Sequence, residues 1–144
     1  MKIYTTYILL LMLMTAFSCE EEKDCCVFES DELIGTWLLY EHGYSPGDRY
    51  ITEAVPDSPP QKMIFQSGNK FVTTIENLSE YKFYVILHDG ESDKILALFK
   101  IDPGTKALDI QNLEHAYTIQ KNADRISLHY RYCIEGCHLG LKRI

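Results

Sequence analysis

Apolar and polar residues alternate in short runs through most of the chain after Gly35. The clearest run is Arg125 to Tyr132, in which Ile, Leu and Tyr take every second position. A period of two places alternate side chains on opposite faces, which is typical of a β-strand with one buried face. By the same criterion, the sequence predicts further strands at 36–42, 62–65, 70–75, 81–88, 94–101, 108–110, 116–121 and 138–144.

Turn-forming residues separate these runs, as in Gly68-Asn69, Asp89-Gly90 and Pro103-Gly104. Because the connections are short, strands that are neighbours in sequence should pair antiparallel. Closing such a sheet up and down removes its exposed edges. The sequence therefore predicts an all-β domain, an antiparallel up-and-down β-barrel of about 8–9 strands, with a β-sandwich as the alternative. The stretch 43–60 is long and contains four prolines, and we expect it to be an irregular loop that gates the open end.

The chain begins with a segment typical of secretion signals. Lys2 precedes a short apolar run, Tyr7 to Met14, and small residues follow it. The run is well short of the roughly 20 apolar residues that a membrane-spanning helix needs. We therefore expect residues 1–18 to be a signal peptide.

Ala16-Phe17-Ser18-Cys19 resembles a bacterial lipobox, in which the cysteine is lipidated and becomes the new N-terminus. The acidic run that follows resembles the export tag of Bacteroidetes-type surface lipoproteins. The resemblance implies a lipid on Cys19 and an anchor at the outer membrane or elsewhere in the cell envelope. On this interpretation residues 19–31 are an acidic tether and residues 32–144 are the folded domain.

Gly35-Thr36-Trp37 stands at the head of the first strand and holds the only tryptophan of the chain. These residues resemble the Gly-x-Trp signature of lipocalins and lipocalin-like proteins. The resemblance implies a calycin-type barrel in which a late arginine packs over the tryptophan at the closed end. Arg143 is the candidate for that arginine, and Arg131 is the alternative.

The aromatic residues of the inferred inward faces are candidates for lining a ligand cavity, with hydroxyl groups as polar contacts. They are Tyr81, Phe83, Phe99, Tyr130 and Tyr132. The expected ligand is a small apolar or amphipathic molecule. The alternative is a filled core, since side chains can just fill the interior of a small eight-stranded barrel. The domain would then be a non-catalytic envelope accessory domain that meets a protein partner.

If Cys19 carries lipid, four cysteines remain, and an exported protein favours disulfides. Cys133 and Cys137 flank a three-residue turn, at a distance that a disulfide spans. We expect that local bridge. The alternative pairs these two cysteines with Cys25 and Cys26, and a zinc site that adds His138 is a further hypothesis.

The formal net charge is −7 and the chain has no basic run, so phosphate-driven nucleic-acid binding is not expected. The sequence contains no nucleophile elbow, phosphate loop, dinucleotide fingerprint or His-Glu-x-x-His motif. We therefore predict no catalytic site, no cofactor and no metal, and interpret the chain as a binding or interaction domain.

Overall fold

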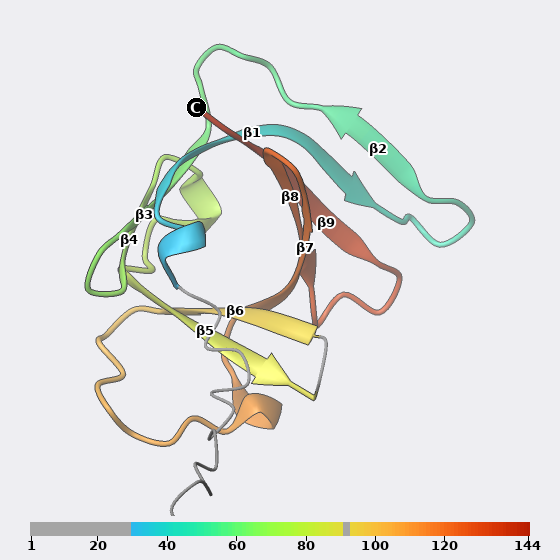
Figure 1. The fold of residues 1–144 in the computed structure, drawn as a ribbon. Helices are drawn as coiled ribbons and strands as arrows, with labels where there is room; N and C mark the ends of the chain where they lie inside the picture. Colours follow the sequence, from blue (N-terminus) through green and yellow to red (C-terminus); the bar gives the residue numbers. More distant parts are fainter. Residues whose placement is uncertain (1–29, 91–92) are drawn as a thin grey trace, which may run out of the picture.

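The computed structural model describes residues 30–90 and 93–144 as a single nine-stranded antiparallel sheet (Figure 1). The strands are β1 (Gly35–Tyr44), β2 (Ile51–Ala54), β3 (Lys62–Gln66), β4 (Lys70–Thr73), β5 (Phe83–Asp89), β6 (Asp93–Phe99), β7 (Ala116–Asn122), β8 (Arg125–Tyr130) and β9 (Cys137–Arg143). In this described part of the chain they are accompanied by three single 3-10 turns, η2 (Ser30–Glu32), η3 (Glu76–Leu78) and η4 (Ile110–Asn112). The prediction of an all-β, antiparallel, up-and-down domain is confirmed.

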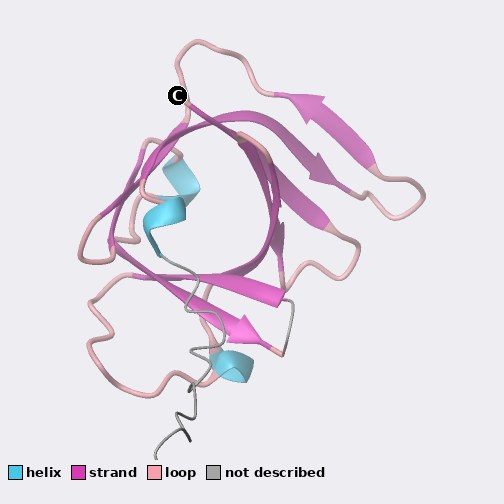
Figure 2. Ribbon diagram, viewed as in Figure 1, coloured by secondary structure: helices cyan, strands magenta, loops and turns pink. Residues whose placement is uncertain are grey.

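The sheet closes into a barrel-like ring because β1 also pairs with β9 (Figure 2). The first half of β1 pairs with β3, and β3 to β9 follow one another around the ring in chain order. β2 pairs with the second half of β1 and extends the sheet beside the ring. The β-sandwich alternative is wrong, since all nine strands belong to one sheet.

A bulge in β1 separates the half of this strand that pairs with β3 from the half that pairs with β2. The register against β9 shifts between Leu39, which pairs with Leu141, and Glu41, which pairs with Gly140. A bulge bends a strand and increases its local twist. Beyond the bulge, β1 leaves β3 and pairs with β2 instead.

Two element predictions were wrong, although the number of strands agrees. Residues 51–54, expected to lie in a gating loop, form β2, whose residues from Thr52 to Ala54 are exposed and so carry no apolar alternation. Residues 108–110 do not form a strand. Asp109 instead accepts a hydrogen bond from the backbone nitrogen of Gln111 at 3.0 Å and begins η4.

The hydrophobic residues form two clusters, one inside the ring and one outside it. The interior cluster includes Trp37, Met63, Phe65, Phe71, Tyr84, Leu96, Leu98, Leu128 and Leu141. The second cluster includes Ile95, Ala97, Leu113 and Ala116, with Leu87, Phe99 and Ile110 packed against it. It lies where the segment between β6 and β7 covers the outer face of β6 (Figure 1).

This second cluster reverses the predicted faces of β5 and β6. Tyr84 and Leu98 pair across these strands and belong to the interior cluster. Phe83 pairs with Phe99, and Phe99 packs against the outer cluster. Because successive residues of a strand face opposite sides, Phe83 and Phe99 do not line the interior as predicted.

Candidate functional site

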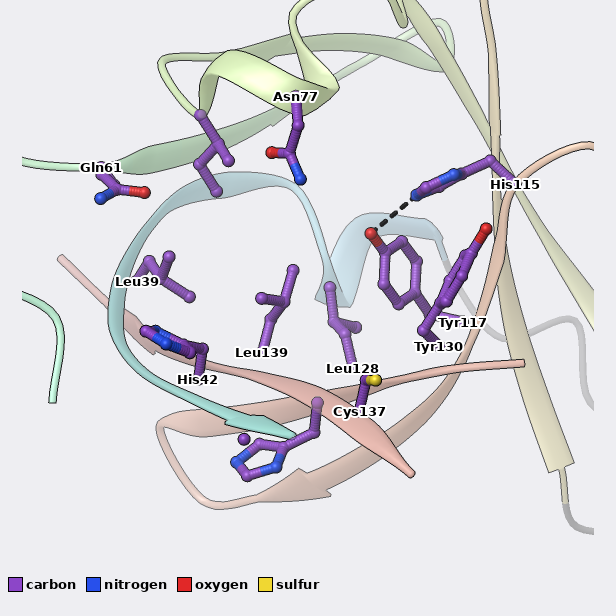
Figure 3. A pocket seen from close by; sticks show the side chains of 13 residues that line it. Leu39, His42, Gln61, Asn77, His115, Tyr117, Leu128, Tyr130, Cys137 and Leu139 are labelled. Carbon is purple, nitrogen blue, oxygen red and sulfur yellow. Dashed lines mark hydrogen bonds between the residues drawn. The ribbon is translucent and has the colours of Figure 1, made fainter. Parts of the chain in front are cut away.

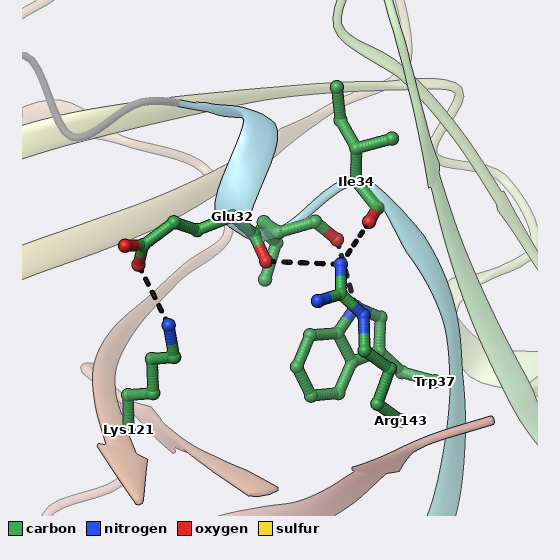
Figure 4. A network of polar contacts seen from close by, with 6 residues as sticks. Glu32, Ile34, Trp37, Lys121 and Arg143 are labelled. Carbon is green, nitrogen blue, oxygen red and sulfur yellow. Dashed lines mark hydrogen bonds and ion pairs between the residues drawn. The ribbon is translucent and has the colours of Figure 1, made fainter. Parts of the chain in front are cut away.

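One end of the ring is filled around Trp37 (Figure 4). The indole is 1% exposed, and its nitrogen donates a hydrogen bond to the Leu33 carbonyl at 2.8 Å. The Arg143 guanidinium lies over the indole ring, 5.2 Å from the ring centre, and donates to the backbone carbonyls of Glu32 and Ile34. Residues 32–34 are thereby held across this end of the ring, which we call the closed end.

An ion pair and a glycine with a positive φ also contribute to the closed end. Lys121 of β7 contacts the Glu32 carboxylate at 2.9 Å, and this hydrogen bond lowers the pKa of Glu32. Gly35 has a φ of 140°, and a Cβ there would lie 3.3 Å from the Arg143 side chain. Of the two arginines considered for the tryptophan, Arg143 occupies the place, and Arg131 pairs with Asp89 at 3.1 Å. These contacts pack the indole, the Arg143 guanidinium and residues 32–34 together at the closed end.

A cavity of about 410 Å³ lies at the other end of the ring (Figure 3). We call this end the open end, since β1 and β9 place Tyr44 and Cys137 there, opposite the Trp37–Arg143 pair. The lining residues are Leu39, His42, Gly43, Gln61, Ile75, Asn77, His115, Tyr117, Leu128, Tyr130, Cys137, His138 and Leu139. Leucine and isoleucine side chains form its apolar wall, and amide, imidazole and phenol groups supply its polar contacts.

Aromatic rings gather on the β7–β8 side of the cavity. His115 precedes β7, and its Nε2 is hydrogen-bonded to the Tyr117 hydroxyl at 2.8 Å. The His115 ring also lies 4.8 Å from the ring of Tyr81 and 4.8 Å from that of Tyr130. Burial lowers the pKa of His115 and strongly raises the pKa of Tyr117, so both groups are neutral near neutral pH.

The rim of the cavity is more polar. His42 contacts the Glu53 carboxylate of β2 at 3.2 Å, and both side chains are about half exposed. The Tyr44 hydroxyl donates to the other oxygen of Glu53 at 3.0 Å. β2, which was not predicted from the sequence, therefore supplies the carboxylate that contacts both His42 and Tyr44 at the rim.

A second polar group packs on the outer face of β9. His138 contacts Glu41 at 3.4 Å and is hydrogen-bonded through Nδ1 to the Tyr50 hydroxyl. Gly43 makes this packing feasible, because a Cβ there would collide with the His138 ring and the Tyr50 hydroxyl. The His129 ring lies 5.7 Å from the His138 ring in a tilted arrangement, and the pKa of His129 is lowered by burial and by His138.

The five aromatic residues predicted to line a cavity lie in three different environments. Tyr130 lines the cavity, and Tyr81 is buried in the interior cluster beside it. Phe83 and Phe99 lie on the outer face described above, and Tyr132 is 45% exposed and donates to the Leu113 carbonyl.

Sequence reasoning missed Tyr117 and His115. Tyr117 pairs directly with Tyr130 across β7 and β8, so the strand pairing would have indicated it. His115 precedes β7 and lies outside any alternating pattern.

Cys133 and Cys137 form the predicted local disulfide, with their Cα atoms 5.8 Å apart. Their sulfurs are bonded to each other and are not free thiolates for zinc. Within residues 30–90 and 93–144, no group of three or more His, Cys, Asp or Glu side chains is placed to hold a metal ion. The predicted signal peptide, the predicted lipidation site Cys19, and Cys25 and Cys26 lie outside the described residues.

No family model, curated protein or solved structure matches this chain. In the part of the chain that the structure describes, no helix is long and apolar enough to cross a membrane.

Proposed function

We propose that this chain is an envelope lipoprotein whose lipocalin-like domain binds a small apolar or amphipathic molecule in the open-end cavity, without catalysis. The tethered placement rests on the leader and on Cys19. The ligand-binding part of the proposal rests on the cavity.

The observation that carries the proposal is the coexistence of a packed closed end with a cavity of about 410 Å³ at the open end. Ligand sites in proteins usually measure about 300–1,000 Å³ and are mostly apolar with a few polar groups. Leu39, Leu128 and Leu139 supply the apolar wall, and His115 and Tyr117 supply a hydrogen-bonding pair. A ring filled throughout by side chains would offer no such space.

The proposal is tested with N-phenyl-naphthylamine, a neutral probe whose fluorescence rises in apolar sites. The purified protein should bind the probe at one saturable site. Leu139→Trp should abolish that binding because the larger side chain occupies the cavity, whereas Val72→Trp, at a 47% exposed position on β4, should leave it unchanged. Absence of saturable binding to the unmodified protein, or equal binding by both variants, would refute a ligand site here.

One observation favours the alternative, a protein-interaction domain. Ile134 is fully exposed at the tip of the turn that the Cys133–Cys137 disulfide fixes. An exposed apolar residue on a rigid turn is suited to contact with a partner. Site-specific photocrosslinking from position 134, with exposed position 101 as the control, would show a discrete adduct at 134 alone if this function holds.

A further inference from the structure

The open-end cavity is polar without being charged. Among the described residues that line it, none is a lysine, arginine, aspartate or glutamate. Two of its polar groups are the amides of Gln61 and Asn77, which do not ionise. Two more are the phenols of Tyr117 and Tyr130, and burial raises the pKa of Tyr117 further. Of the described residues that line this cavity, only the histidines could place a positive charge there near neutral pH.

None of the three histidines that line the cavity offers an unpaired positive charge to an anionic ligand. His115 is kept neutral by burial and is hydrogen-bonded to Tyr117 at 2.8 Å. His42 faces the Glu53 carboxylate at 3.2 Å. The His138 ring, on the outer face of β9, faces the Glu41 carboxylate at 3.4 Å. A protonated imidazole at either of the last two positions would already have its counter-charge.

The charges behind the aromatic wall also oppose an anion. Lys100 lies over the Tyr81 ring, and its ammonium contacts Glu80 at 3.0 Å and Glu114 at 3.1 Å. Two carboxylates and one ammonium leave a net negative charge beside His115. An anionic headgroup that entered the cavity would therefore lose its hydration without gaining a cation, which is strongly unfavourable.

We infer that the ligand is an uncharged amphipathic molecule, with a hydroxyl or amide group that meets the His115–Tyr117 pair and an apolar body against the leucine wall. A hydroxyl or amide both donates and accepts, so it satisfies an imidazole–phenol pair in either tautomer. This inference rests on the proposed function and restricts it, because it excludes fatty carboxylates and other anionic amphiphiles.

Two probes that differ in one charged group test the inference. Anilinonaphthalene sulfonate has the ring system of N-phenyl-naphthylamine and adds a sulfonate. Counting only the binding that Leu139→Trp abolishes, the neutral probe should bind at least about tenfold more tightly, which corresponds to about 1.4 kcal/mol. Equal or tighter binding of the sulfonate would overturn the inference. Failure of both probes would instead contradict the proposed function.

A charge-adding variant tests the cause of the selectivity. Asn77→Lys places an ammonium at the cavity from an exposed position in η3, so folding should survive. It should raise the affinity for the sulfonate by about tenfold or more and change the affinity for the neutral probe little. Gln61→Lys repeats the test from another side, and Val72→Lys on the outer surface is the control. If neither cavity lysine raises the sulfonate affinity above that of the control, the charge argument is wrong.

Discussion

Replacing Trp37 tests whether the closed end anchors the fold. The indole is 1% exposed and is packed within the interior cluster. Truncating a buried tryptophan to alanine costs about 3–5 kcal/mol through lost burial and the cavity left behind. The Leu33 carbonyl also loses its donor, which adds about 1–3 kcal/mol if water does not replace it. Since single domains are stable by only about 5–15 kcal/mol, Trp37→Ala should remove a large share of the stability.

Trp37→Phe separates the two contributions. Phenylalanine keeps an aromatic ring beneath Arg143 but lacks the N–H that reaches the Leu33 carbonyl at 2.8 Å. The expected loss is about 1–3 kcal/mol, close to the cost of one buried unsatisfied carbonyl. The free energy of unfolding should therefore decrease in the order wild type, Trp37→Phe, Trp37→Ala.

Urea unfolding followed by far-ultraviolet circular dichroism is the suitable assay, because either substitution removes the only tryptophan and its fluorescence. The free energy of unfolding comes from linear extrapolation to zero urea. Val72→Ala, at an exposed position of β4, is the control and should change stability by less than about 0.5 kcal/mol. A loss below about 1 kcal/mol for Trp37→Ala would refute the conclusion that this end anchors the core.

Three further predictions concern the disulfide, the anchor and pH. Replacing Cys133 and Cys137 together by serine should cost about 2 kcal/mol in urea unfolding, because the loop they close is short, and a loss well above this would show a larger role. Cys19→Ala should move the protein from the membrane to the soluble fraction, and continued membrane retention would contradict the lipid anchor. Burial lowers the pKa of His115 in the folded protein below its ordinary value of 6.5. Below pH 6.5 this imidazole therefore binds a proton more readily in the unfolded chain than in the folded one. The contribution of His115 to stability should therefore be complete above about pH 6.5 and be lost as the pH falls from there through the lower pKa of the folded state. His115→Gln should weaken this loss in acid urea titrations, and His129, whose pKa is also lowered, should contribute to the loss that remains.

Strand identity was predictable where one face of a strand is apolar and the other is polar. β8 is such a strand, with Ile126, Leu128 and Tyr130 inside and polar residues outside. β5 and β6 are apolar on both faces because the segment before β7 covers their outer side. A period of two cannot identify the inward face of a strand that is buried on both faces. The predicted inward positions of Phe83 and Phe99 were wrong for this reason.

β2 illustrates the opposite case, a strand formed by its partner rather than by its own pattern. Its residues are mostly exposed, and it exists because the second half of β1 extends beyond β3 and offers a free edge. The bulge between Leu39 and Glu41 lies where that extension begins, and nothing in the local sequence marks it. The rim contact between His42 and Glu53 depends on the pairing of β2 with the second half of β1, so it could not be predicted from the sequence.

The cavity itself arises from a change of side-chain size along strands that run the length of the ring. β1 places Trp37 at the closed end and Leu39 farther along, and β9 places Leu139 and Cys137 opposite the second half of β1. Trp37 and Phe65 therefore fill the closed end, whereas at the open end the shorter side chains of Leu39, Leu128 and Leu139 leave space opposite the aromatic rings of β7 and β8. Which residues share a level depends on the register between β1 and β9, including its bulge. A cavity set by register in this way becomes visible only after the strands are paired, and it should be filled at the open end by Leu139→Trp while the contacts of Trp37 persist.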